Sequence, residues 1–418
     1  MRVLQALWDG GGNVGPQLAI GRRLVERGHD VRILGHACQR PRVEAIGARF
    51  VPYRHAPDGD ASSPETDLIR DWEARTPIGA FARMRDRVMF GPSLRFARDV
   101  LAEIEREPAD VVAWDFMLLG AGVAAERAGV PSAMLVHTVY PLPLEGVPPF
   151  GQGLMPAQGP LGRARDAVLA RAFVRAFKPG LKALNATRRE LGLEPAAGPF
   201  EHLDRVDVAL VLTSERFDFP DPGQLPAHVR YTGPVLGSAP AGGWESPWDA
   251  DDPRPLVLVS FSTTFQDQRA LAERVIAALG TLPVRALLTV GPSLDIEGIP
   301  LPANVEARDF VPHAAVLGQA SLVVTHAGLG TVHAALAAGV PLVCLPDGRD
   351  QNDNAARVVA AGAGLRLPKR ASAARLAKTI AAALADPQLA EAAAQMSRSL
   401  ATADGAASAV AELEALAG

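Results

Sequence analysis

Short hydrophobic runs alternate along this chain with longer segments whose apolar residues recur at helical spacing. Such runs, closed by glycine or polar residues, predict buried strands, and the amphipathic segments predict helices. The predicted strands are 3–8, 31–35, 110–114, 132–136, 206–212, 256–261, 285–290 and 321–325. The predicted helices are 16–27, 119–128, 269–279, one from about 331, and a helical tail over 373–417. This order predicts an α/β fold built on parallel sheets.

A change in composition near the middle predicts two domains. Residues 217–255 are crowded with Pro, Gly, Asp and Ser, which is typical of a linker. We expect an N-terminal domain over 1–215, a linker over 216–250 and a second domain over 251–395. A C-terminal helix over 396–418 is expected to pack back on the N-terminal domain. Residues 54–92 and 141–160 look irregular, and we expect them to form walls of a binding pocket.

Composition narrows the class of protein. The net charge of −4 gives no reason to expect nucleic acid as a partner. Two cysteines without paired spacing argue against a disulfide framework and fit a reducing compartment. The first residues, MRVLQALWDGGG, predict a strand rather than a signal peptide, and apolar runs are too short for a membrane span. We therefore expect a cytoplasmic protein that does not insert stably into a membrane.

The most informative segment joins a strand, a small-residue turn and a helix. The strand over 321–325 runs into His326, Gly328, Gly330 and Thr331, where an Ala-rich helix begins. Free N–H groups at a helix N-terminus attract anions, so this segment predicts a phosphate-bearing ligand. The alternative is a turn of small residues that packs a helix closely on a sheet.

A second glycine-rich turn has the spacing of a dinucleotide fingerprint. Residues 10–15, GGGNVG, follow a strand and precede a helix. That fingerprint also requires an acidic residue at the end of the second strand, whereas VRILGH ends in Gly35 and His36. We favour a tight turn close to some ligand over a nicotinamide or flavin site.

Together these segments resemble a known family. The stretches DFVPH, VVTHAGLGT, AALAAGVP and RDQNDNAARV are similar to the donor-binding signature of nucleotide-sugar glycosyltransferases of the GT-B fold. The chain is similar to the bacterial natural-product (macrolide and antibiotic) members, and GGGNVGPQLAIGRRLVERGHDV and DVVAWD extend the resemblance to the N-terminus. It implies two Rossmann-like domains facing a cleft. It also implies inverting, metal-independent transfer of a hexose or deoxyhexose from a UDP- or TDP-sugar to a lipophilic polyketide or phenolic acceptor, without a cofactor. The sequence leaves a homodimer open.

The resemblance assigns donor-binding roles residue by residue. It implies that the diphosphate is held by His326, Gly328, Gly330 and Thr331, and the hexose hydroxyls by Asp350 and Gln351. The nucleobase of the donor is expected near Phe310, Val311 and His313. A phosphate of the donor or the acceptor is expected near Ser262 and Thr263. Simpler interpretations are a helix N-cap for Asp350, a core position for Phe310 and an ordinary strand-end turn at Ser262. The acidic residue that binds ribose in plant members is replaced by Ala334, so the ribose contact is unassigned.

The catalytic base is the open question. The family places a histidine where this chain has Asn13, and an amide cannot take a proton at neutral pH. Asp115, which follows VVAW, matches the carboxylate that supports that histidine. Either Asp115 or Asp9 acts as the base, directly or through water, or Asn13 only orients an acidic acceptor, or the chain is an inactive homologue that serves as a partner protein.

His137, at the end of a strand, is a further candidate base, although a structural role is also common at such positions. We expect Gly12, Trp114 and Phe116 to contact the acceptor. A GT-B-fold sugar-nucleotide epimerase and a Rossmann oxidoreductase are competing functions.

Overall fold

The computed structural model describes residues 1–236, 243–249, 251–401 and 404–418, which form two compact units. Unit 1 comprises Met1–Pro149, Pro156–Gly237 and Asp404–Gly418, and unit 2 comprises Phe150–Met155 and Ser238–Ala403. The chain therefore passes between the units four times. Residues 237–242 and 250 of the expected linker lie outside the described residues. Each unit contains a parallel sheet with helices, which confirms the predicted α/β class.

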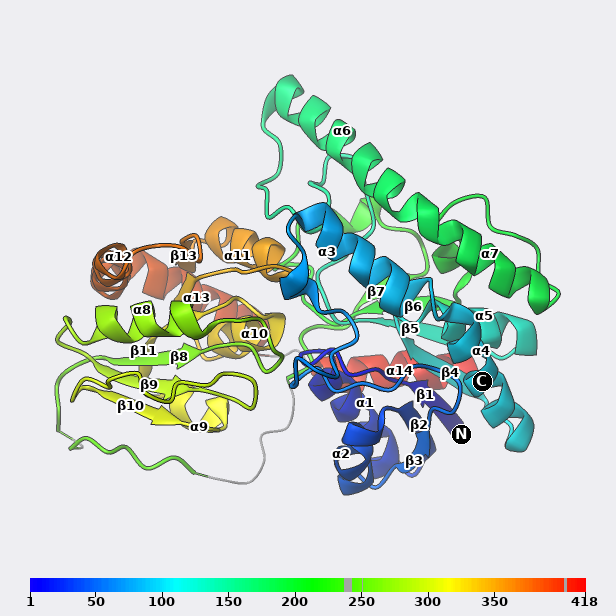
Figure 1. The fold of residues 1–418 in the computed structure, drawn as a ribbon, viewed down its shortest axis with the longest axis horizontal. Coiled ribbons are helices and arrows are strands. Elements are labelled where there is room, and N and C mark those ends of the chain that lie inside the picture. Colours follow the sequence, from blue (N-terminus) through cyan, green and yellow to red (C-terminus); the bar gives the residue numbers. More distant parts are fainter. Residues whose placement is uncertain (237–242, 250, 402–403) are drawn as a thin grey trace. The chain divides into compact units, whose positions relative to one another are not determined.

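Unit 1 is built on a seven-stranded parallel sheet with the order β3-β2-β1-β4-β5-β6-β7 (Figure 1). Its strands are β1 (Arg2–Ala6), β2 (Asp30–Gly35), β3 (Arg49–Pro52), β4 (Val111–Asp115), β5 (Ser132–Val136), β6 (Val208–Val211) and β7 (Val229–Tyr231). Its α-helices are α1 (Val14–Glu26), α2 (Arg40–Ala45), α3 (Pro77–Met84), α4 (Ser93–Arg106), α5 (Leu119–Ala128), α6 (Gly159–Phe177), α7 (Leu181–Glu190) and α14 (Gly405–Ala417).

The central strands of unit 1 are buried on both faces, which explains their continuous hydrophobic runs. One face packs under α1 and α14, and the other packs under α4, α5 and α7. In α14, Ala409, Val410 and Leu413 belong to the same buried cluster as the apolar residues of α1. Gly405, at the start of α14, has no room for a side chain, because a Cβ would come within 2.4 Å of the Gly233 carbonyl oxygen. The C-terminal helix is thus a part of the core of unit 1.

The prediction that residues 54–92 are irregular is wrong in its second half. The helix α3 begins after Thr76, whose hydroxyl accepts a hydrogen bond from the Gly79 N–H at 3.1 Å, and a π-helical turn follows over Arg85–Met89. Met89 and Phe90 are buried in the core of unit 1. This segment therefore contributes packing as well as surface.

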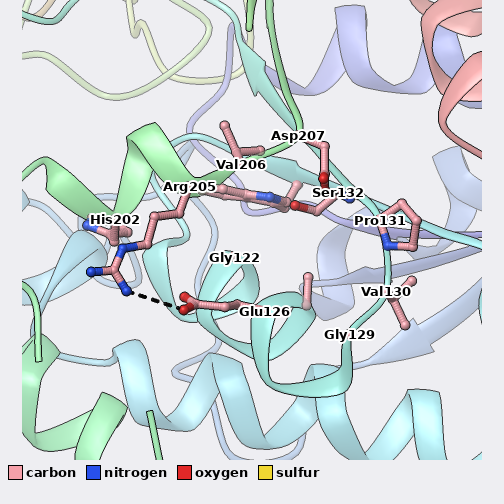
Figure 2. A pocket seen from close by; sticks show the side chains of 12 residues that line it. Gly122, Glu126, Gly129, Val130, Pro131, Ser132, His202, Arg205, Val206 and Asp207 are labelled. Atoms are coloured by element: carbon pink, nitrogen blue, oxygen red, sulfur yellow. Dashed lines mark hydrogen bonds and ion pairs between the residues drawn. The ribbon is translucent and has the colours of Figure 1, made fainter. Parts of the chain in front are cut away.

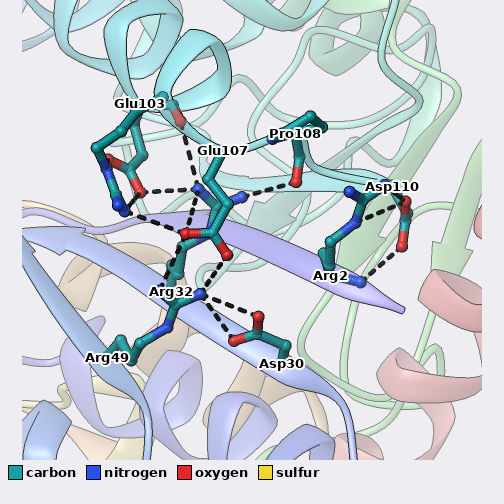
Figure 3. A network of polar contacts seen from close by, with 9 residues as sticks. Arg2, Asp30, Arg32, Arg49, Glu103, Glu107, Pro108 and Asp110 are labelled. Carbon is teal, nitrogen blue, oxygen red and sulfur yellow. Dashed lines mark hydrogen bonds and ion pairs between the residues drawn. The ribbon is translucent and has the colours of Figure 1, made fainter.

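A buried ion pair links β2 to α4 in unit 1. The Arg32 side chain is fully buried, and its Nη1 lies 2.8 Å from Glu103 Oε1. Figure 3 shows Arg49 and Glu107 extending this pair into a network at the surface. Arg106 joins the network through Glu103, at 2.6 Å. Nη2 of Arg32 also donates to the Pro108 carbonyl oxygen at 3.0 Å. A buried charge is tolerated only when it is paired and hydrogen-bonded in this way.

Unit 2 is built on a six-stranded parallel sheet with the order β10-β9-β8-β11-β12-β13. Its strands are β8 (Leu256–Ser260), β9 (Arg285–Thr289), β10 (Val305–Arg308), β11 (Ala320–Thr325), β12 (Leu342–Cys344) and β13 (Gly364–Arg366). Its helices are α8 (Arg269–Leu279), α9 (His313–Leu317), α10 (Leu329–Ala337), α11 (Gln351–Ala360), α12 (Ala373–Ala385) and α13 (Pro387–Leu400). The strand order reverses between β8 and β11, and ligands of such sheets bind at this switch point, outside the carboxyl ends of the strands. No helix among the described residues is both long enough and apolar enough to cross a membrane.

The short segment Phe150–Met155 is tied to α11 of unit 2. Asp353 on α11 accepts hydrogen bonds from the Gly151 N–H at 2.6 Å and the Gly153 N–H at 3.2 Å. Arg366 donates to the Gly153 carbonyl oxygen at 2.7 Å. Burial raises the pKa of Asp353 to about 6, although Arg357 and the two N–H groups oppose this shift.

Candidate functional site

Three loops of unit 2 meet at the carboxyl edge of its sheet, because β8, β11 and β12 are neighbours. The loops that follow these strands are joined by side-chain hydrogen bonds. Gln351 Nε2 donates to Gln266 Oε1 at 2.9 Å, and Arg349 Nη1 donates to Thr264 Oγ1 at 2.8 Å. The residues that the sequence predicted as a donor site are therefore gathered at one edge, and Gln266 and Thr264 are additional members that the sequence did not indicate.

The predicted phosphate-binding turn places His326 beside the start of α10. His326 Nδ1 lies 3.4 Å from the Ser260 carbonyl oxygen, and a Cβ on Gly328 would come within 2.5 Å of His326 Nε2. Glycine is therefore required at this position by the histidine ring itself. Burial, with a smaller contribution from the positive charge of Arg349, lowers the pKa of His326 to about 4 against the opposing effect of the Ser260 carbonyl. His326 is thus neutral at pH 7, and an anion at the turn would meet the N–H groups of the first helical turn.

Asp350 and Gln351 occupy different environments. Asp350 is at the N-cap position of α11, but its side chain makes no capping hydrogen bond. One of its oxygens accepts instead from Asn354 Nδ2 at 2.8 Å, so capping does not explain the carboxylate. Gln351 is buried, and its Oε1 accepts from the Asp347 N–H at 2.8 Å while its Nε2 binds Gln266. Gln351 therefore braces the loop after β12 in this structure.

The remaining predicted donor residues lie on the loops after β8 and β10. Ser262 is buried, and its hydroxyl lies 2.9 Å from that of Thr264, whereas Thr263 is exposed. Phe310 is 65% exposed, which rules out the interpretation as a core residue. Val311 is buried beside it, and burial lowers the pKa of His313 at the start of α9. An exposed aromatic ring is a suitable surface for stacking on a nucleobase.

In unit 1, Asp115 lies at the end of β4 and its side chain is fully buried. One carboxylate oxygen accepts hydrogen bonds from Asn13 Nδ2 at 2.7 Å and from Gln17 Nε2 at 2.5 Å. The other accepts from the Met117 N–H at 3.0 Å. A carboxylate enclosed in this way does not reach an acceptor, so the interpretation of Asp115 as a direct base is not supported.

Asn13 is also enclosed, with 2% of the residue exposed. Its Nδ2 donates to the Trp8 carbonyl oxygen at 3.0 Å as well as to Asp115, and its Oδ1 accepts from the Gly10 N–H at 3.1 Å. The amide is used to hold the turn after β1 against Asp115. The interpretation that Asn13 orients the acceptor therefore loses its support.

His137, which follows β5, is the histidine that the fold brings to Asp115. Its Nδ1 lies 3.3 Å from Asp115 Oδ2, although the angle in this conformation is not that of a hydrogen bond. The side chain is 13% exposed, and its ring lies 4.9 Å from that of Phe116. The sequence named both residues as candidates but did not predict that they form a pair.

Two other predicted residues remain on loops of unit 1. Asp9 accepts a hydrogen bond from the Ala61 N–H at 2.8 Å, and one of its oxygens lies with ligand atoms of Cys38 and Asp60 within 4.8 Å of one another. Gly12 is exposed at the turn before α1. Within the part of the chain that the structure describes, neither residue is hydrogen-bonded to Asp115.

The expectation that Trp114 contacts the acceptor is not supported. Trp114 is buried and lines a cavity of about 290 Å³ in unit 1, near the first residue of β5, Ser132 (Figure 2). Asp115 and His137 lie at the carboxyl ends of β4 and β5, whereas this cavity lies near the amino end of β5. His202, whose ring nitrogens have no hydrogen-bond partner, also lines this cavity, and burial lowers its pKa to about 3.

Comparison with solved structures defines the class of fold. The glycotransferase of kitacinnamycin superposes with a TM-score of 0.76 at 24% identity, covering 99% of this chain and 98% of that chain. A calicheamicin glycosyltransferase superposes with a TM-score of 0.74 at 23% identity over the same shares. The fold is the GT-B fold of glycosyltransferases.

Sequence comparison places the chain within that class. Residues 273–416 match the family model of the erythromycin biosynthesis protein CIII-like C-terminal domain. The chain is 34% identical over 422 residues to 4'-demethylrebeccamycin synthase of Lentzea aerocolonigenes, covering 99% of both proteins. It is 29% identical to oleandomycin glycosyltransferase of Streptomyces antibioticus, covering 90% of this chain and 81% of that protein. The chain belongs to the glycosyltransferases of antibiotic biosynthesis, and the oxidoreductase interpretation of the GGGNVG turn is set aside.

Proposed function

We propose that this enzyme transfers a hexose or deoxyhexose from a UDP- or TDP-sugar to a lipophilic natural-product acceptor, with inversion and without a metal ion. The observation that carries the proposal is the junction of three loops at the switch point of unit 2, where Arg349, His326 and Asp350 come together with Thr264. Family membership supports it, since the relatives include an oleandomycin glycosyltransferase.

In the proposed reaction, unit 2 holds the donor. The N–H groups at the start of α10 and the hydroxyl of Thr331 bind the diphosphate, because helix N-termini favour negative charge. The exposed ring of Phe310 stacks on the base, and the Asp350 carboxylate accepts hydrogen bonds from sugar hydroxyls. Gln351 keeps that carboxylate in place by bracing the loop that carries it.

Unit 1 supplies the base. His137 Nδ1 lies 3.3 Å from Asp115 Oδ2, so a small rotation of the ring would direct its N–H at that oxygen and leave Nε2 as the acceptor of a proton. Nε2 takes the proton of the acceptor O–H or N–H while that oxygen or nitrogen attacks the anomeric carbon. The bond from that carbon to the nucleoside diphosphate breaks on the opposite face, which inverts the configuration. Asn13 and Gln17 orient Asp115 through their hydrogen bonds.

The test is donor turnover by the purified protein. UDP- and TDP-hexoses are incubated with polyketide and phenolic acceptors, and nucleoside diphosphate release is followed together with glycoside mass. Acceptor-dependent release with an inverted glycoside, established by NMR coupling at the anomeric proton, is the expected result. Conversion of the donor without any acceptor would instead indicate an epimerase.

A second function follows from the asparagine at the family base position. An inactive homologue that binds a nucleotide sugar and assists another transferase would bind donor without turnover across the panel. Restoration of turnover by Asn13→His, from none, would identify the loss of the base as the cause.

A further inference from the structure

Arg349 has an unusual backbone conformation at the donor loops. Its φ of 53° lies in the left-handed region, which residues with a side chain rarely adopt. Among the described non-glycine residues with positive φ, Asp267, Ala327 and Arg349 lie on the loops after β8, β11 and β12, and a single other one lies elsewhere. Strain of this kind persists where the surrounding structure enforces it, and it concentrates at ligand sites.

The side chain of Arg349 is directed toward the turn after β8. Its Nη1 donates to Thr264 Oγ1 at 2.8 Å, and Thr264 is in turn 2.9 Å from the hydroxyl of Ser262. The guanidinium is also close enough to His326 for its charge to act on that ring. Arg349 therefore stands between the serine–threonine turn and the histidine turn, the two segments expected to face phosphates.

The chemistry at this position calls for a cation. A departing nucleoside diphosphate carries negative charge that increases as the bond to the sugar breaks. His326 is neutral at pH 7, because burial lowers its pKa to about 4, and Asp350 adds a negative charge of its own. Within the donor segments 262–264, 326–331 and 349–351, Arg349 is the residue with a permanent positive charge. A guanidinium is also suited to phosphate because it donates two parallel hydrogen bonds.

We propose that Arg349 is a catalytic residue that binds the diphosphate of the donor and stabilises its charge as the sugar leaves, with Thr264 as its positioning residue. This inference rests on the proposed function. It assigns the arginine to the phosphates and not to the sugar, whose hydroxyls are left to Asp350.

The experiment compares nucleosides with and without their diphosphate group. Binding of UDP, TDP, uridine and thymidine is measured by calorimetry for the wild type, Arg349→Gln, Arg349→Lys and Thr264→Val. Loss of one charge-assisted contact corresponds to about a 10- to 100-fold weaker binding. We expect that loss for the diphosphates with Arg349→Gln, no change for the nucleosides, and intermediate values for Arg349→Lys and Thr264→Val. Arg308→Gln, which removes an exposed arginine on β10, is the matched control.

Three outcomes overturn the inference. Equal weakening of diphosphates and nucleosides would indicate a disturbed loop. Unchanged UDP and TDP binding by Arg349→Gln would show that the arginine does not bind the diphosphate. A wild type that binds none of the four ligands would overturn the proposed function as well, and this result is distinct from the other two.

Discussion

Replacement of His137 by glutamine separates catalysis from folding. Nδ1 of His137 makes no hydrogen bond in this conformation and the side chain is partly exposed, so we expect the free energy of unfolding to change by about 1 kcal/mol or less. Removal of a general base lowers turnover by about 10²- to 10⁴-fold, which corresponds to about 3–5 kcal/mol in the activation barrier.

Asp115→Asn is predicted to behave differently. Three hydrogen bonds, from Asn13, Gln17 and Met117, lose their charged acceptor, and the new amide N–H₂ has to face one of these donors. Charge-assisted hydrogen bonds are worth about 1 kcal/mol more than neutral ones, so the variant loses about 3–4 kcal/mol of stability as well as activity. The free energy of unfolding of a typical domain is about 5–15 kcal/mol in total, so this loss is a large part of it.

The assay measures glycoside formation at saturating donor, urea unfolding and donor affinity for each variant. Donor affinity should be unchanged in His137→Gln, because the predicted donor residues belong to unit 2. His55→Gln, which replaces an exposed histidine of unit 1, serves as the control. Retention of more than about a third of wild-type turnover by His137→Gln would refute the assignment of the base, since general bases contribute far more than this.

Other predictions concern stability, pH and metal ions. Glu103→Gln removes the carboxylate nearest to the buried Arg32 and leaves Glu107, at 3.8 Å, as its remaining ion-pair partner, so it should cost up to about 3–5 kcal/mol in urea unfolding. Glu105→Gln on the exposed face of α4 should cost almost nothing, and similar values for both variants would contradict the structural role of Glu103. Burial lowers the pKa of three histidines, His202, His326 and His333, to about 3 or 4. These values lie below the pKa of histidine in an unfolded chain, so the unfolded state binds more protons than the folded state as the pH falls. The contribution of these neutral histidines to the free energy of unfolding is complete above about pH 6.5 and is lost toward pH 4. The urea midpoint should therefore fall over this range, and a constant midpoint would argue that the histidines are not buried in the neutral form. Treatment with EDTA should leave turnover unchanged; loss of activity that a divalent cation restores would show that a metal takes part.

The strands that the sequence predicted are largely buried, although β12, a buried strand of three residues, was not among them. Leu256–Ser260 and Ser132–Val136 are continuous apolar runs because helices cover both sides of their sheets. The edge strands β3 and β10 are only partly buried, and their sequences, RFVP and VEAR, contain no such run. The helix α3 did carry a local signal, the Thr76–Pro77 start, which the surrounding Pro and Gly residues obscured.

The candidate site was predictable where its residues are close in sequence. The His326 turn and the Asp350–Gln351 pair each form one short motif, and each follows a strand. Their bracing partners are distant: Gln266 is 85 residues from Gln351, and Gln17 is 98 residues from Asp115. No local pattern specifies such pairs, because they depend on which strands become neighbours in the sheet.

The participation of α14 in the core of unit 1 limits how this enzyme can be recombined with its relatives. A chimera joined once, in the segment between β7 and β8, would combine the first part of unit 1 from one parent with an α14 from the other. Ala409, Val410 and Leu413 would then pack against a core from the other parent. The close contact between Gly405 and Gly233 would likewise join residues from two parents. The segment Phe150–Met155 would meet a foreign α11 in the same way. Exchange of donor specificity therefore calls for a second junction near residue 404 and for a transfer of residues 150–155 together with unit 2.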